Sequence, residues 1–165
     1  MIPTKSNHVE TLTQFGPNFQ IRMAIVIDSF PTEGVHNIFE VTKDFDPLGP
    51  GSRYPALWIT KDEILACTFY YDDNKHPEGG HYMSYGGIKI NKVYYIVLKL
   101  ENGLFQFIVN GEEVGALQVE NPLIYNYLKL YLAHPWSDPF DGSILHFHLD
   151  GNMGKNFILT LNFEL

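Results

Sequence analysis

The sequence contains a single cysteine, Cys67, no long apolar run and no cluster of basic residues. One thiol alone allows neither an intramolecular disulfide nor a cysteine-based zinc site, and its apolar alternating surroundings predict a buried thiol. No stretch approaches the roughly 18 consecutive apolar residues of a membrane span, so we expect no insertion into a membrane. The first ten residues show no signal peptide, which fits either a cytoplasmic chain or the mature form of a secreted one.

Positive charge is scarce along the whole chain. Eleven lysines and arginines stand against 19 aspartates and glutamates, which gives a formal net charge of −8. Nucleic-acid binding depends on cations that contact phosphates, so this composition predicts no nucleic-acid partner. It also argues against an anionic membrane surface, and the acidic surplus is best explained by solubility.

Sequence motifs of common catalytic sites are missing as well. There is no Gly-x-Ser-x-Gly elbow, and the segment Gly49-Pro50-Gly51 lacks the lysine and the following helix of a phosphate-binding loop. His146 and His148 flank one residue of an expected strand, so both face the same side of a sheet. Without further ligands at a defined spacing, they indicate a solvent-facing pair rather than a zinc site. We therefore predict that the chain is not an enzyme.

Aromatic and turn-forming residues, in contrast, are abundant. Aromatics make up 15% of the chain, with 14 glycines and 10 prolines, and this favours strands joined by many turns. In residues 94–119, Asn102-Gly103 and Asn110-Gly111 predict two type I′ turns and a three-stranded meander. A two-residue turn fixes the register on both sides. The expected apolar partners are Leu100 with Phe105, Leu98 with Phe107, Ile96 with Val109, Phe107 with Val114 and Phe105 with Ala116.

The rest of the chain repeats the period-two alternation and shows no convincing helix. About eleven to thirteen strands at this spacing predict an all-β fold, an antiparallel β-sandwich of two sheets with jelly-roll connections. The chain length is that of one domain, residues 1–165. Further strands are expected in residues 8–15, as an edge strand, and in 19–27, 36–42, 56–59, 63–71, 125–133, 143–149 and 156–165, and Ile88 with Ile90 fit a strand.

Four segments between about Asn18 and Leu149 also carry a family resemblance. They read FQIRMAIVIDSFPTEGVHNIFEVTKD, GSRYPALWIT, YYIVLKLENGLFQFIVNGEEV and LKLYLAHPWSDPFDGSILHFHL. Together they resemble the concanavalin A-like lectin and glucanase superfamily, in its laminin G-like branch. The resemblance implies a two-sheet jelly roll that binds carbohydrate or protein through rim loops or its concave face, often with calcium. It also implies a secreted protein, although it leaves a cytoplasmic location open.

The chain departs from two members of that superfamily. The galectin motifs His-x-Asn-Pro-Arg and Trp-Gly-x-Glu are missing, and so is the Glu-x-Asp-x-x-Glu strand of the glucanases. No catalytic residue carries over from the resemblance.

The segment 134–142, HPWSDPFDG, is the first candidate ligand loop. Asp138 and Asp141 offer hard oxygen atoms in a proline-stiffened loop, as calcium requires, and Trp136 offers an aromatic face to a sugar ring. The alternative is ordinary turn chemistry, with Trp136 closing one end of the sandwich.

A second candidate loop follows the strand that ends near Tyr71. Its side chains could bind sugar hydroxyls or calcium, and the alternative is a solvated hairpin tip. The candidate ligands are Tyr71, Asp72, Asn74 and His76. Asp44 and Asp46 stand in a further loop of the same kind, and Tyr125, Tyr127 and Tyr131 could form a sugar platform or be half-buried sheet residues.

These features favour a lectin-like recognition domain that binds a glycan or glycoprotein through rim loops, with calcium as a candidate cofactor. The second hypothesis is a protein-interaction or adhesion module, self-associating through sheet edges as a homo-oligomer. A weaker third hypothesis is a glycan hydrolase, which would need two carboxylates about 5–10 Å apart in a groove. A shallow polar cleft would favour sugar, and a flat apolar patch a protein partner.

Overall fold

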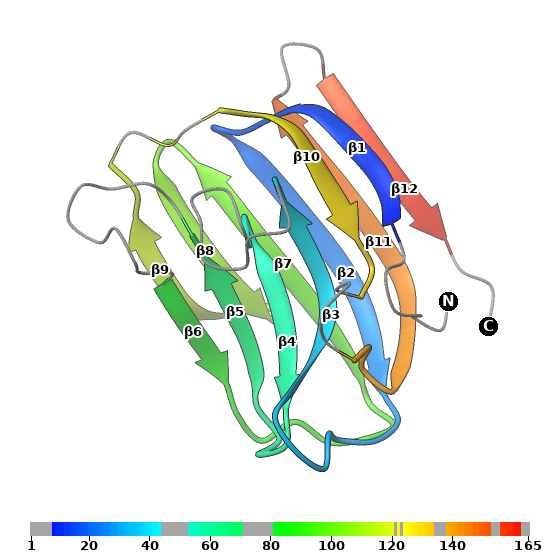
Figure 1. The fold of residues 1–165 in the computed structure, drawn as a ribbon. Helices are drawn as coiled ribbons and strands as arrows, with labels where there is room; N and C mark the ends of the chain where they lie inside the picture. Colours follow the sequence, from blue (N-terminus) through cyan, green and yellow to red (C-terminus); the bar gives the residue numbers. More distant parts are fainter. Residues whose placement is uncertain are drawn as a thin grey trace.

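The computed structural model describes residues 8–43, 53–70, 81–120, 122, 124–133, 138–152 and 156–162, with side chains up to residue 151. Within these ranges the chain is all β, with twelve strands in two antiparallel sheets that face each other (Figure 1). No described helix is long and apolar enough to cross a lipid bilayer. The strands are β1 (His8–Phe15), β2 (Phe19–Ile27), β3 (Val35–Thr42), β4 (Ala56–Thr60), β5 (Leu65–Phe69), β6 (His81–Tyr85), β7 (Val93–Glu101), β8 (Leu104–Val109), β9 (Glu112–Gln118), β10 (Tyr125–Tyr131), β11 (Gly142–Asn152) and β12 (Asn156–Asn162).

Each sheet has six strands, and the chain crosses repeatedly between them. The first sheet, called sheet A, has the order β1-β10-β3-β4-β5-β6, and the second, sheet B, has the order β12-β11-β2-β7-β8-β9. Figure 1 shows β4 and β5 between β3 and β6 in the sheet nearer the viewer. The predicted antiparallel two-sheet jelly roll is confirmed, and β1 is an edge strand as expected.

The core lies between the sheets and is filled by the inward positions of each strand. In β2 every second residue from Phe19 to Ile27 is at most 4% exposed, as the alternation predicts. The rings of Phe69 in sheet A and Phe105 in sheet B stack with centroids 4.1 Å apart, so they join the two layers. Cys67 is buried, as expected, and burial raises the pKa of its thiol.

The first Asn-Gly hairpin has the predicted register. Leu100 pairs with Phe105 and Ile96 with Val109, and both Asn102 and Asn110 have positive φ angles. A type I′ turn requires this conformation, and asparagine adopts it more readily than most residues.

The predicted register of the second hairpin is wrong beyond its turn. A bulge between Phe107 and Ile108 shifts the pairing by one residue. Val114 and Leu117 are three positions apart, and both pack against the core. Strict alternation cannot bring two residues at odd spacing to one face, and the bulge resolves this conflict. The observed partners are Phe107 with Gly115 and Phe105 with Leu117, in place of Val114 and Ala116.

Two further expectations are corrected. Ile88 and Ile90 belong to the connection between β6 and β7 rather than to a strand, and Ile88 is buried while its N–H donates to the Glu63 carbonyl. The tyrosines of β10 form no common platform. Tyr125 lies in the core, Tyr131 is 7% exposed and Tyr127 is 68% exposed, because a left-handed φ at Tyr127 interrupts the alternation.

Candidate functional site

A cavity of about 240 Å³ lies on the outer face of sheet A, over β4 and β5. Cross-strand partners of an antiparallel sheet point to the same face, and here Trp58 pairs with Ala66 and Thr68 with Tyr82. The register therefore brings residues from three strands together. We call this the Trp58 cavity, and its lining includes Val35, Arg53, Trp58, Ala66, Thr68 and Tyr82.

Trp58 forms a fixed part of the cavity lining. Its neighbours Leu57 and Ile59 point into the core, so alternation along β4 directs the indole to the outer face. Trp58 packs with the small side chains of Ala56 and Ala66 in a cluster separate from the main core. The indole N–H donates a hydrogen bond of 3.0 Å to the Thr68 hydroxyl, which fixes the plane of the ring.

Arg53 brings a cation to the same place. Its guanidinium carbon lies 5.1 Å from the centroid of the Trp58 ring and 5.8 Å from that of Tyr70, within cation–π range of both. The Arg53 carbonyl accepts the Tyr70 N–H at 3.1 Å, so its backbone is held beside the end of β5. The Nε atom is buried without a hydrogen-bond partner. Within the described ranges, no carboxylate forms an ion pair with this guanidinium.

Tyr82 supplies an aromatic ring that is accessible to solvent. It is 58% exposed, whereas Trp58 is only 7% exposed. A ligand in the cavity would therefore contact Tyr82 more extensively than the indole. The described residues that line the cavity include no carboxylate, histidine or cysteine, so they offer apolar contact and hydrogen bonds but no general acid or base.

The predicted ligand residues Asp138 and Asp141 lie on the other side of β3. The Asp138 carbonyl accepts the Asn37 N–H at 3.1 Å, and Pro139 forms a parallel bridge with the same residue. The Asp141 carboxylate accepts a 2.6 Å hydrogen bond from the Ser29 hydroxyl. These contacts attach residues 138–141 to β3 and to the β2–β3 loop. Since Asn37 pairs with Trp58, the segment ends one strand away from the Trp58 cavity.

The other predicted site residues are not among those that the structure describes. Trp136, Tyr71, Asp72, Asn74 and His76 all lie outside these ranges, as do Asp44 and Asp46. In the described part of the chain, no three acidic, histidine or cysteine side chains gather as a metal site would require. Calcium binding by Asp138 and Asp141 stays a prediction.

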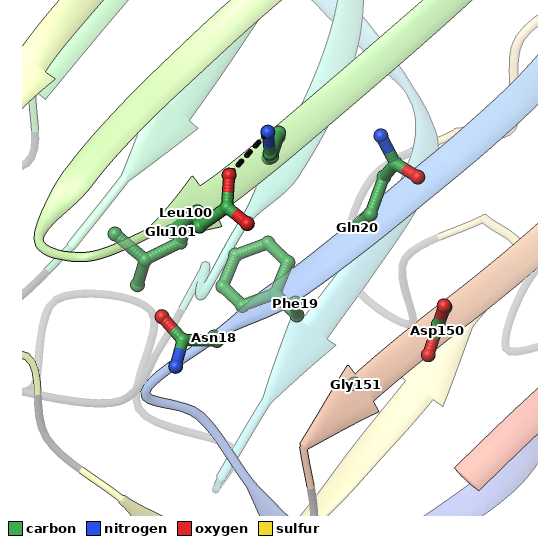
Figure 2. Close-up of a pocket in the computed structure, with 8 residues that line it drawn as sticks. Asn18, Phe19, Gln20, Leu100, Glu101, Asp150 and Gly151 are labelled. Atoms are coloured by element: carbon green, nitrogen blue, oxygen red, sulfur yellow. Dashed lines mark ion pairs between the residues drawn. The ribbon is translucent and has the colours of Figure 1, made fainter. Parts of the chain in front are cut away.

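A second cavity, of about 300 Å³, lies on sheet B and differs in chemistry. Figure 2 shows Gln20 of β2, Glu101 of β7 and Asp150 of β11 around it. Lys99 and Glu101 form an ion pair at 2.5 Å, so this cation is already neutralised. Phe19 is 4% exposed, and its ring belongs to the core. This cavity is polar and offers no aromatic surface to a ligand.

The histidine pair shares one face of β11, as predicted. The rings of His146 and His148 stack with centroids 6.4 Å apart, and both residues are half-buried. Burial lowers the pKa of His148, and the neighbouring Arg22 lowers it further.

The residues of the Trp58 cavity are not among those predicted from the sequence. The segment around Trp58 contributes to the family resemblance, and no motif marks Arg53 or Tyr82. One signal was available, because a tryptophan between two inward residues must point away from the core. The position of Arg53 depends on its contacts with Trp58 and Tyr70, and the sequence shows neither.

Neither the protein-family models nor the curated protein sequences match this sequence. Among solved structures, the Trypanosoma rangeli sialidase matches with a TM-score of 0.55 and 18% identity, over 77% of this chain and 19% of the sialidase chain. A Ruminococcus gnavus IT-sialidase CBM40 bound to α2,3-sialyllactose matches with a TM-score of 0.51 and 12% identity, over 84% of each chain. The binding domain of Botulinum neurotoxin DC, in complex with rat synaptotagmin II, matches with a TM-score of 0.54 and 15% identity, over 85% of this chain and 33% of that one. These likenesses show that the chain has the β-sandwich fold of such domains.

Proposed function

We propose that this chain is a carbohydrate-binding domain of the concanavalin A-like, laminin G-like type, which binds a glycan in the Trp58 cavity without cleaving it. The observation that carries the proposal is the composition of this cavity. An exposed tyrosine, a threonine and a guanidinium meet on an open sheet face. Ligand sites typically combine apolar walls with a few convergent polar groups in this way.

A sugar ring matches these groups in chemistry. Its C–H faces are apolar and can rest on the Tyr82 ring, while its hydroxyls can bond the Thr68 hydroxyl and the N–H groups of Arg53. The cavity volume of about 240 Å³ lies just below the range of about 300–1,000 Å³ that is usual for small-molecule sites. We therefore propose that one terminal sugar residue enters the cavity and that the rest of the glycan extends into solvent.

The similar structures include one bound to a glycan and one bound to a protein, so the chemistry of the cavity has to decide between these partners. The CBM40 module covers most of this chain and is bound to sialyllactose, whereas the botulinum domain is in complex with the protein synaptotagmin II. A protein partner would fit a flat apolar patch better than a small cavity with a cation and hydroxyls. For this reason we place the glycan first.

The lack of acid–base groups in the described lining supports binding without cleavage. Glycoside hydrolysis needs two carboxylates, about 5–10 Å apart, on either side of the scissile bond. Any oligosaccharide that binds should therefore be recovered intact after prolonged incubation, as measured by mass spectrometry. Release of shorter products by the purified protein would contradict this part of the proposal.

The proposal is tested by screening the purified chain on a glycan array and measuring the affinity of each hit by calorimetry. Removing the exposed ring in Tyr82→Ala should weaken binding about two- to tenfold, as expected for one lost aromatic contact. Tyr95→Ala is the matched control, because Tyr95 is 63% exposed and lies on sheet B. Equal affinities of the two variants, or no glycan binding by the wild type, would contradict the proposal.

A further inference from the structure

Arg53 brings a positive charge to the Trp58 cavity, and no described carboxylate forms an ion pair with it. Among the described residues, Lys89 and Lys99 in contrast have glutamate partners at 3.4 and 2.5 Å. Arg53 lies against the rings of Trp58 and Tyr70, and its Nε atom is buried without a hydrogen-bond partner. A donor without an acceptor is costly, and because Nε is closed to solvent, an anionic ligand would bond the terminal N–H groups of the guanidinium.

The aromatic contacts of Arg53 give it no hydrogen-bond acceptor. Its guanidinium carbon lies 5.1 Å from the centroid of the Trp58 ring and 5.8 Å from that of Tyr70. The N–H groups of a guanidinium form a planar fork that fits the two oxygens of a carboxylate. Such charge-assisted, bidentate pairs are stronger and more directional than hydrogen bonds between neutral groups.

The electrostatic setting makes this cation unusual for the molecule. The chain carries a formal net charge of −8, yet the described lining of the Trp58 cavity contains one arginine and no carboxylate. A neutral sugar would gain little from this local charge, whereas an anionic sugar would gain a strong partner. The peptide group that joins Arg53 to Tyr54 is also held at both ends, since the Arg53 carbonyl accepts the Tyr70 N–H at 3.1 Å and the Tyr54 N–H donates to the Val41 carbonyl at 2.7 Å.

We propose that the Trp58 cavity selects sugars that bear a carboxylate, such as a sialic or uronic acid, and that Arg53 binds this carboxylate. The inference rests on the proposed glycan-binding function and adds the ligand class and the selecting residue. One guanidinium balances one carboxylate charge, and the Tyr82 ring beside Thr68 receives the sugar ring.

The test compares ligands that differ only in their charge. Methyl glucuronide and sialyllactose are each titrated by calorimetry against their own uncharged methyl ester, so that the two arms separate uronic from sialic acids. Each acid should bind about ten- to hundredfold more tightly than its neutral counterpart, as expected for one hydrogen-bonded charge pair. A sulfated lactose serves as a third arm, and it should bind more weakly than sialyllactose.

Two arginine variants test whether Arg53 causes the preference for acidic sugars. Arg53→Gln should remove the preference for acids while leaving weak binding of neutral sugars. Arg22→Gln is the matched control, because Arg22 is the other arginine of the chain and lies exposed on sheet B. Circular dichroism checks that each variant is folded. If Arg53→Gln does not fold, the comparison of acid and ester on the wild type still tests the ligand class. The NMR signal of the Arg53 Nε–H group then tests the role of Arg53, because it should shift when the acid binds.

The outcomes separate this inference from the proposed function. Equal binding of acids and esters overturns the selectivity but leaves a glycan-binding domain. Unchanged acid binding by folded Arg53→Gln overturns the role of Arg53, and sulfated lactose that binds as well as sialyllactose overturns the choice of carboxylate. If no sugar binds, both proposals are wrong.

Discussion

The two Asn-Gly corners allow a controlled test of the hairpins that organise sheet B. Gly103 and Gly111 occupy equivalent turn positions with φ angles of +79° and +83°. Their surroundings differ. A Cβ at Gly111 would meet nothing within 4 Å, whereas a Cβ at Gly103 would lie 2.9 Å from the Val119 carbonyl oxygen and 3.0 Å from the Gln118 amide nitrogen.

The expected losses of stability follow from these distances. Alanine in a left-handed conformation costs about 1–2 kcal/mol, and this is the whole effect expected for Gly111→Ala. At Gly103 the added methyl also disturbs two hydrogen bonds to the Gly103 carbonyl, from Val119 N–H at 2.7 Å and from the Gln118 amide at 3.1 Å. Each is worth about 1 kcal/mol, so Gly103→Ala should cost about 1–2 kcal/mol more than Gly111→Ala.

Urea denaturation of both variants beside the wild type measures this difference. For a domain of this size, each kcal/mol also lowers the melting temperature by about 2–4 °C, which gives a second readout. If the two variants lose equal stability, or if Gly111→Ala loses more, the assigned turn geometry is wrong.

Three further predictions concern the core, pH and metal. Phe105→Ala should destabilise the domain by about 3–5 kcal/mol, because it removes the ring that stacks on Phe69, and a loss below 1 kcal/mol in urea denaturation would contradict this packing. Burial lowers the pKa of His148, so the unfolded chain binds this proton more readily, and stability should fall as the pH drops through about 6.5. His148→Gln should reduce that fall, and an NMR titration that gives His148 a raised pKa would contradict it. Calcium should raise the melting temperature of the wild type but not that of the double variant Asp138→Ala/Asp141→Ala. An unchanged melting temperature of the wild type would contradict the prediction that these two residues bind calcium.

Much of the fold follows from local patterns in the sequence. The alternation of β2 and the Asn102-Gly103 turn specify their faces and register through nearest neighbours alone, so both are predicted correctly. The register of β9 is not, since the bulge depends on whether Val114 and Leu117 are both needed in the core. Local alternation cannot express that choice, because it results from packing between the sheets.

The candidate site was harder to predict, because it assembles residues that are distant in sequence. The residues predicted from the sequence belong to expected loops with acidic and aromatic side chains, whereas the cavity is built on a sheet face by the pairing of β4, β5 and β6. The outward direction of Trp58 follows from alternation. The position of the Arg53 guanidinium near the indole does not follow from alternation, because Arg53 precedes β4 and its placement depends on tertiary contacts.

The most direct test of the account is an NMR titration that follows the indole N–H of Trp58 while a carboxylate-bearing sugar is added. This proton bonds the Thr68 hydroxyl inside the cavity, so its resonance reports on the site itself. The account predicts a saturable shift of the indole signal together with the amide signals of Thr68 and Tyr82. Saturable shifts confined to sheet B, for example at Gln20 and Lys99, would contradict it.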